Sequence, residues 1–130
     1  MPGMAKYILD ASALLALLNA EKGADAVQEL LPEAAISTVN LAEVVTRLSA
    51  VGIPDNEIRE ILSLLGLEGM VFDEEQAFLA GLLISHTQPF GLSLGDRACL
   101  ALSQAKIATA VTADRVWEGL DIGVAIKLIR

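Results

Sequence analysis

The stretch AKYILDASALLALLN, residues 5–19, joins a short β-type run to an apolar-rich segment with the character of a helix. The β-type run ends at Asp10, and the helical segment extends from Ser12 to Asn19. A charged residue that directly follows a buried strand has to be solvated, paired or bound to a ligand. Asp10 is therefore a candidate functional residue as well as the end of the first strand.

Strands and helices continue to alternate along the rest of the chain. Hydrophobic periodicity and breaker residues predict further helices over residues 23–31, 39–51, 56–66, 74–87 and 93–106, and short strands over residues 35–37, 70–72, 108–111 and 124–129. These strands are short continuous apolar runs, as is typical of strands that are buried on both faces of a parallel sheet. We predict one α/β domain spanning residues 1–130, an α/β/α sandwich with a central parallel sheet of four to five strands.

Composition supports a globular protein with an aliphatic core, since 54% of the 130 residues are hydrophobic and only 4% are aromatic. The apolar runs are much shorter than the roughly 20 residues needed to cross a bilayer, so we expect no membrane span. The single cysteine, Cys99, excludes an internal disulfide and is expected to be a small buried hydrophobe. A cytoplasmic location fits these features.

The formal net charge of −8 argues against a broad, non-specific grip on nucleic acid, which rests on basic surfaces. If RNA is the substrate, the attraction has to come from local arginines, bound cations or a second subunit.

Four carboxylates are the candidate site residues. Ligands of open α/β sheets bind at the carboxyl ends of the strands. Asp10 and Asp114 follow the first and fourth predicted strands, while Glu43 and Asp96 lie near the starts of predicted helices. All four could therefore face one edge of the sheet.

Three of these carboxylates also have a purely structural interpretation. Asn40 to Glu43 and Ser93 to Asp96 have the spacing of a capping box, and Asp114 could cap a short helix that starts at Arg115. These interpretations stay open at the level of the sequence.

Grouped carboxylates would need a partner of opposite charge. Two unit charges 4 Å apart repel by about 4 kcal/mol at an effective dielectric constant of 20, so such a cluster holds either protons or a cation. Oxygen donors with no histidine or cysteine beside them favour Mg²⁺ or Mn²⁺ over zinc.

The chain resembles the PIN-domain family, and in particular the VapC-type toxins of toxin–antitoxin pairs. The resemblance rests on four segments: YILDASALLALL at 7–18, NLAEVV at 40–45, LSLGDRACLALS at 92–103 and AVTADRVW at 110–117. In that family a D-x-S, an S/T-x-x-x-x-E, a helical Asp and a T-x-D form the active centre. They correspond here to Asp10 and Ser12, Thr38 and Glu43, Asp96, and Thr112 and Asp114.

The resemblance implies a single PIN-like domain and a metal-dependent endoribonuclease that hydrolyses RNA phosphodiester bonds. One or two Mg²⁺ or Mn²⁺ ions would be held by Asp10, Asp96 and Asp114, with Glu43 as a further ligand or as the group that orients the attacking water. For a type II toxin, the resemblance implies a cognate antitoxin that blocks the acidic site. The leucine-rich helices between residues 39 and 65 could form an apolar groove that binds the antitoxin, or the contact face of a homodimer.

Four neighbouring side chains have two interpretations each. Ser12 and Thr112 could support a ligand or metal-bound water, or act as helix and turn caps. Arg97 and Arg115 directly follow site carboxylates and are candidate phosphate contacts, or are simply solvated.

Competing functions remain for the whole chain. A phosphatase of the haloacid dehalogenase type also has an Asp after its first strand, but its second Asp two residues later is Ser12 here. Two further possibilities are a PIN nuclease that is not a toxin and a catalytically silent interaction module of the same fold. Trp117 could stack on a base, although covering the sheet edge is the simpler role.

Overall fold

A computed structural model describes residues 4–130, which form one five-stranded sheet in the order β3-β2-β1-β4-β5. All four neighbouring pairs are parallel. The strands are β1 (Tyr7–Leu9), β2 (Ala34–Ser37), β3 (Glu68–Met70), β4 (Thr109–Thr112) and β5 (Ile126–Leu128). The α/β class and the parallel sheet predicted from the sequence are confirmed, with five strands.

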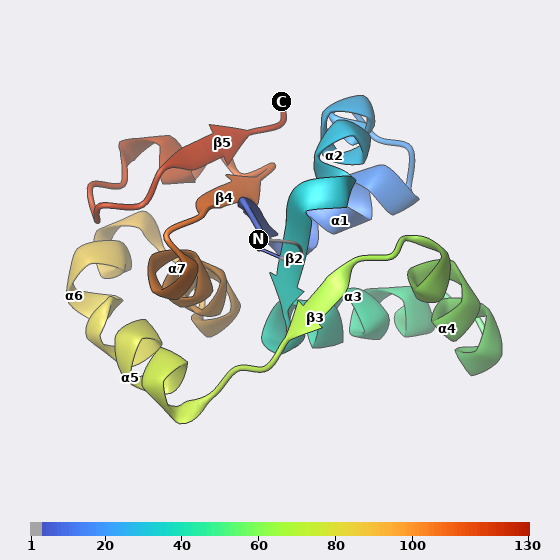
Figure 1. Cartoon of the computed structure of the whole chain (residues 1–130), viewed down its shortest axis with the longest axis horizontal. Helices are drawn as coiled ribbons and strands as arrows, with labels where there is room; N and C mark the ends of the chain where they lie inside the picture. Colours follow the sequence, from blue (N-terminus) through green and yellow to red (C-terminus); the bar gives the residue numbers. More distant parts are fainter. Residues whose placement is uncertain (1–3) are drawn as a thin grey trace.

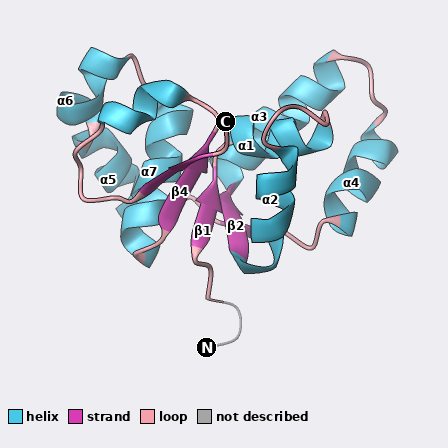
Figure 2. Cartoon of the chain, turned by 90° about the horizontal axis from the view of Figure 1, so that it is seen from above, coloured by secondary structure: helices cyan, strands magenta, loops and turns pink. Residues whose placement is uncertain are grey.

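Helices cover both faces of this sheet, with α1 to α4 on one side and α5 to α7 on the other (Figures 1 and 2). Their bounds are α1 (Ala11–Leu18), α2 (Ala24–Leu30), α3 (Thr38–Ala50), α4 (Asp55–Leu64), α5 (Glu74–Leu82), α6 (Ile84–Thr87) and α7 (Leu94–Lys106). Three 3₁₀ turns complete the chain: η1 (Leu31–Glu33), η2 (Gln88–Phe90) and η3 (Arg115–Gly119). Among residues 4–130, no helix has both the length and the apolar character of a membrane span.

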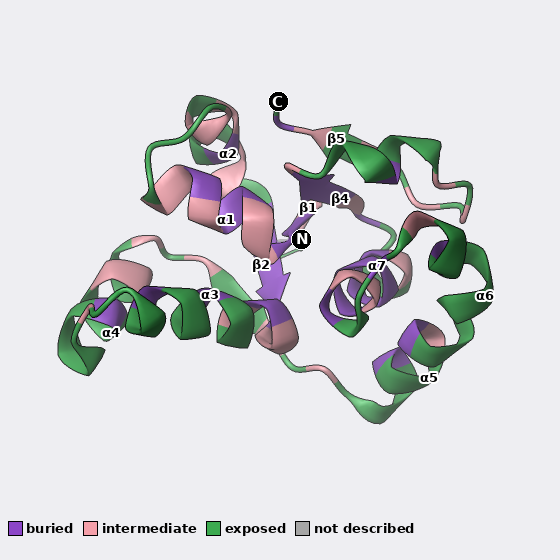
Figure 3. Cartoon of the chain, turned by 180° about the vertical axis from the view of Figure 1, so that it is seen from behind, coloured by how far each residue is buried: buried purple, intermediate pink, exposed green. Residues whose placement is uncertain are grey.

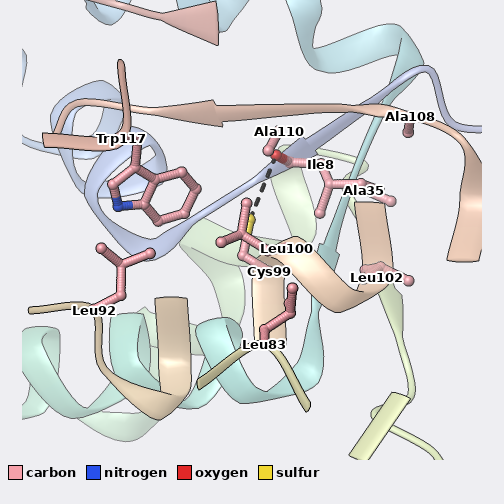
Figure 4. Close-up of a cluster of buried hydrophobic side chains, with 10 residues drawn as sticks. All are labelled: Ile8, Ala35, Leu83, Leu92, Cys99, Leu100, Leu102, Ala108, Ala110 and Trp117. Carbon is pink, nitrogen blue, oxygen red and sulfur yellow. Dashed lines mark hydrogen bonds between the residues drawn. The ribbon is translucent and has the colours of Figure 1, made fainter. Parts of the chain in front are cut away.

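Alternate residues of the central strands contribute to different parts of the core. Ile8 of β1 belongs to a buried cluster with residues of α7 (Figure 4), whereas Leu9 packs with residues of α1 and α2. Cys99 and Trp117 are fully buried in the α7 cluster. Cys99 is therefore the buried hydrophobe expected from the sequence, and Trp117 has no exposed ring face on which a base could stack. The outward faces of α4 and α5 are exposed (Figure 3).

Two predicted boundaries are wrong. The helix expected over residues 74–87 is interrupted at Leu83, so that α5 and α6 are separate. The strand expected over residues 70–72 is β3, which lies two residues earlier at Glu68–Met70. β3 is an edge strand with two exposed residues, so an apolar run does not mark its position.

The end of α7 offers a test of backbone strain. Ile107 adopts a left-handed conformation with φ 52°, and its side chain is 95% exposed. A left-handed residue with a Cβ costs roughly 1–2 kcal/mol, whereas glycine avoids this penalty but adds entropy to the unfolded chain. We expect Ile107→Gly to raise the free energy of unfolding by about 0.5–1 kcal/mol in urea denaturation. Ile107→Val keeps the branched Cβ and should give no gain; a less stable glycine variant would contradict the prediction.

Candidate active site

The candidate site lies at the carboxyl edge of the sheet, where β1 has β2 on one side and β4 on the other. Chain connections leave in opposite directions at such a point, which opens a crevice for a ligand. A cleft of about 730 Å³ occupies this position. Its lining includes all four carboxylates predicted from the sequence, namely Asp10, Glu43, Asp96 and Asp114. The structure therefore brings together in one cleft residues that are far apart in the sequence, from Asp10 to Asp114.

Asp10 is the most constrained of these carboxylates. It follows β1, caps α1 and is only 3% exposed. Its Oδ1 accepts hydrogen bonds from the Ala13 amide at 2.8 Å and the Ser12 hydroxyl at 2.7 Å, and its Oδ2 accepts one from the Thr112 hydroxyl at 2.5 Å. Burial raises the pKa of Asp10 from 3.8 to about 6, against the lowering effect of these hydrogen bonds, and the charge of Asp96 adds to the rise.

Ser12 and Thr112 connect the ends of the two central strands. Besides bonding Asp10, Ser12 Oγ accepts a hydrogen bond from the Ala113 amide at 2.9 Å, and Thr112 Oγ1 accepts one from the Asp114 amide at 3.0 Å. Both hydroxyls therefore fix the Asp10 carboxylate and the turn after β4. In the structure they act as positioning residues for Asp10.

Glu43 lies on α3 and is held by the side chain of Asn40. The helix is capped by Ser37, whose Oγ accepts a hydrogen bond from the Val39 amide at 3.2 Å. The alternative interpretation of Asn40 and Glu43 as a capping box therefore does not hold, because Asn40 lies inside the helix. The buried Asn40 amide instead donates to Glu43 Oε1 at 2.9 Å and to the Gly95 carbonyl, also at 2.9 Å.

Gly95 makes room for the Glu43 carboxylate. A Cβ built on Gly95 would collide with both carboxylate oxygens of Glu43. Asn40 and Gly95 are thus positioning residues that the sequence did not reveal, because their role depends on the packing of α3 against α7. The only signal was that each lies close in sequence to a predicted site carboxylate.

Asp96 and Asp114 are helix caps, as their structural interpretations predicted. Asp96 and Ser93 form a capping box at α7, with Asp96 Oδ2 accepting a hydrogen bond from the Ser93 amide at 2.9 Å. Asp114 Oδ1 accepts one from the Val116 amide at 3.0 Å at the start of η3. Within residues 4–130 the second oxygen of each carboxylate accepts no hydrogen bond. A capping role therefore leaves each side chain an oxygen for a ligand.

The donors of the cleft fit a hard divalent cation. They are carboxylate oxygens, and no histidine or cysteine lines the cleft among the described residues. Within residues 4–130, no three acidic, histidine or cysteine side chains converge closely enough to hold a metal ion. Mg²⁺ is usually bound through one or two carboxylates and keeps several waters, so a cleft with separated carboxylates suits it. Burial raises the pKa of Asp10, which means that its ionised form is unfavourable in the folded protein. A cation bound nearby would stabilise that ionised form.

The predicted phosphate contacts lie outside the cleft lining. Arg97 donates to the Ala80 carbonyl of α5 at 2.8 Å, and Arg115 donates to the Arg130 carbonyl at 2.9 Å. Thr38, which the family resemblance placed in the active centre, does not line the cleft either. Its hydroxyl accepts a hydrogen bond from the Phe72 amide at 3.2 Å. The arginine that does line the cleft is Arg47. Its position one helical turn after Glu43 was the sequence signal that could have identified it.

Comparisons with known proteins agree with this architecture. A family model for the PIN domain matches residues 7–122. A toxin–antitoxin complex from Klebsiella pneumoniae is similar over 95% of this chain and 98% of that chain, with 21% identity and a TM-score of 0.73. DNA-bound VapBC from Salmonella typhimurium is similar over 98% and 100% of the two chains, with 18% identity and a TM-score of 0.77.

FitAcB from Neisseria gonorrhoeae is similar over 95% of this chain and 97% of that chain, with 20% identity and a TM-score of 0.68. No curated protein shows significant sequence similarity to the chain. The structural matches establish likeness of fold, and the family model covers most of the sequence. The chain therefore belongs to the PIN domain family.

Proposed function

We propose that this protein is a metal-dependent endoribonuclease that hydrolyses RNA phosphodiester bonds and serves as the toxin of a type II toxin–antitoxin pair. The observation that carries the proposal is that Asp10, Glu43, Asp96 and Asp114 all line one cleft at the carboxyl edge of the sheet. Membership of the PIN family supports nuclease chemistry. It also favours this function over a phosphatase, which would need a second Asp at the position of Ser12.

The carboxylates of the cleft would have two different roles in hydrolysis. Asp10, Asp96 and Asp114 would bind Mg²⁺ or Mn²⁺ partly through water molecules, because they do not converge closely enough to hold the ion by direct contacts alone. The ion would make water more acidic and neutralise charge at the phosphate. Glu43, fixed by Asn40, would orient the attacking water and accept its proton. Water oxygen then bonds to phosphorus as the bond to the leaving oxygen breaks, so no covalent enzyme intermediate is needed.

An antitoxin is the proposed protein partner, and the acidic cleft suits a basic segment of it. An apolar groove of about 640 Å³ lies beside the cleft between α3 and α4, with Leu41, Val45, Ile58 and Leu62 in its lining. We propose this groove for an amphipathic antitoxin helix. The structure of similar fold from Klebsiella pneumoniae is described as a toxin–antitoxin complex. A homodimer acting in the cytoplasm completes the proposal.

The nuclease proposal is tested by incubating the purified protein with unstructured and structured RNAs in Mg²⁺ and in Mn²⁺. We expect cleavage by the wild type and a loss of about 10²–10³-fold in kcat for Asp96→Asn, which removes one negative charge from the proposed site of the metal ion that stabilises the transition state. Asp73→Asn is a matched control, because Asp73 caps α5 through the Gln76 amide and does not line the cleft. It should cleave like the wild type.

The competing functions predict different results. A folded wild type that cleaves no RNA with either metal would indicate a catalytically silent interaction module. Cleavage without growth arrest on expression in cells would indicate a PIN nuclease that is not a toxin. Growth arrest that is relieved by co-expressing a DNA-binding protein encoded beside it would support the toxin assignment.

A further inference from the structure

The cleft contains one positive charge among its four carboxylates. Arg47 is the only lysine or arginine among the described residues that line it. It is exposed and lies on α3 four residues after Glu43, a spacing at which opposite charges often pair. Arg47 nevertheless takes part in none of the ion pairs found within residues 4–130. Its guanidinium is therefore available to a ligand in the cleft.

We propose that Arg47 binds a backbone phosphate of the substrate, the one next to the phosphate that is cleaved. The inference rests on the proposed nuclease function. Four residues of an α-helix rise by about 6 Å, which is comparable to the separation of consecutive phosphates along a nucleotide strand. A strand whose scissile phosphate lies beside Glu43 can therefore place its next phosphate beside Arg47.

The wall of the cleft along α3 is compatible with a strand lying there. Ala42, Thr46 and Ala50 line the same side as Glu43 and Arg47, and these side chains are short. A guanidinium can bind two phosphate oxygens at once, which fixes the direction of the strand as well as its position.

The charge of the protein makes one well-placed arginine important. The chain has a formal net charge of −8, so long-range attraction does not hold RNA in this cleft. Arg97 and Arg115 donate to backbone carbonyls outside the cleft lining. The competing structural role for Arg47 is a favourable interaction with the carboxyl end of the α3 dipole, since it lies in the last turn.

The test compares Arg47→Ala with Lys106→Ala, an exposed basic residue in the last turn of α7 that lines neither the cleft nor the apolar groove. The cleaved bond of a short fluorescein-labelled single-stranded RNA is mapped first. Steady-state kinetics are then measured in Mg²⁺ over a series of salt concentrations. Uncharged methylphosphonates are placed at each phosphate beside the cleaved one in turn, and melting temperatures are recorded for every variant.

We expect Arg47→Ala to raise KM about three- to tenfold, as for loss of one hydrogen-bonding contact at a solvent-exposed site, with little change in kcat. The slope of log(kcat/KM) against log salt should become shallower by about 0.7, the value for one phosphate contact on a single strand. One methylphosphonate should weaken wild-type cleavage by a similar factor and have no further effect on Arg47→Ala. Arg47→Lys should restore the salt slope but only part of KM.

Three results would overturn the inference while leaving the nuclease function intact: an unchanged KM with a lower melting temperature, equal effects of Arg47→Ala and Lys106→Ala, or equal methylphosphonate penalties in wild type and Arg47→Ala. If the folded wild type cleaves no RNA in Mg²⁺ or Mn²⁺, the proposed function fails and this inference fails with it.

Discussion

Gly95→Ala should lower RNA cleavage by about ten- to a hundredfold while leaving the protein as stable as the wild type or slightly more stable. The new Cβ would collide with both carboxylate oxygens of Glu43. These atoms are the far end of a flexible side chain on an exposed residue, so Glu43 can swing away without disturbing the core. Displacement of about 1 Å at a catalytic group can reduce the rate a hundredfold.

Stability is expected to respond in the opposite direction. Gly95 lies in the first turn of α7, and alanine is favoured over glycine within helices by up to about 1 kcal/mol. Loss of the Asn40 to Glu43 hydrogen bond offsets part of this gain. Thermal unfolding and single-turnover cleavage, measured on the same preparation, separate the two effects.

Gly81→Ala provides the matched control for this experiment. Gly81 lies within helix α5, and a Cβ there meets nothing within 4 Å. This variant should gain stability and keep full activity. In a Glu43→Ala background, Gly95→Ala should cause no further loss, because the group that it displaces is already gone. Additive losses would show that Gly95 acts by another route.

Asp10→Asn should abolish cleavage and, in the absence of divalent metal, make the protein more stable at neutral pH. The pKa of Asp10 is raised to about 6 in the folded protein from 3.8, chiefly by burial. A difference of about two pKa units corresponds to roughly 3 kcal/mol between the two protonation states. Asparagine is uncharged and is also a good helix cap, so it avoids the unfavourable buried charge.

The sign of the pH dependence follows from the raised pKa. The folded state binds the Asp10 proton more tightly than the unfolded state does. The resulting stabilisation is fully present below pH 3.8 and is lost as the pH rises through about 6. The advantage of Asp10→Asn over the wild type should therefore be absent at low pH and reach roughly 3 kcal/mol above about pH 6, before subtraction of any weakened hydrogen bonds.

Urea unfolding in EDTA across this pH range measures the difference. Asp73→Asn, which replaces an exposed carboxylate at the N-cap of α5, is the matched control. Addition of Mg²⁺ should stabilise the wild type and not Asp10→Asn, since a ligand that binds the folded state raises its stability. A wild type that is more stable than Asp10→Asn throughout would refute the account of a buried, unfavourable charge.

The architecture was largely readable from the sequence because each strand and helix carries a local signal. β1 and α1 follow from the apolar run and the polar residue between them, and parallel strands that are buried on both faces have continuous apolar runs. β3 and the interruption at Leu83 could not be predicted in the same way. The first is an exposed edge strand, and the second has no proline or glycine at the break.

The candidate site was predictable only in part. Asp10 and Asp114 follow strands that turned out to be neighbours, so the general rule for ligand sites was enough to group them. Asn40 and Gly95 are 55 residues apart and meet only because α3 packs against α7. Arg47 was not among the phosphate contacts predicted from the sequence. Arg97 and Arg115 were predicted because each directly follows a site carboxylate in the sequence. Arg47 instead lies one helical turn after Glu43, and both line the same cleft.

The helix caps formed by Asp96 and Asp114 have a consequence for the evolution of such a chain. Both residues support the start of a helical segment through one oxygen, so selection for folding alone would retain them. Asp10 also caps α1, but its buried charge reduces stability when no cation is present. In a descendant under selection for folding alone, we expect Asp96 and Asp114 to be kept and Asp10 to be replaced first.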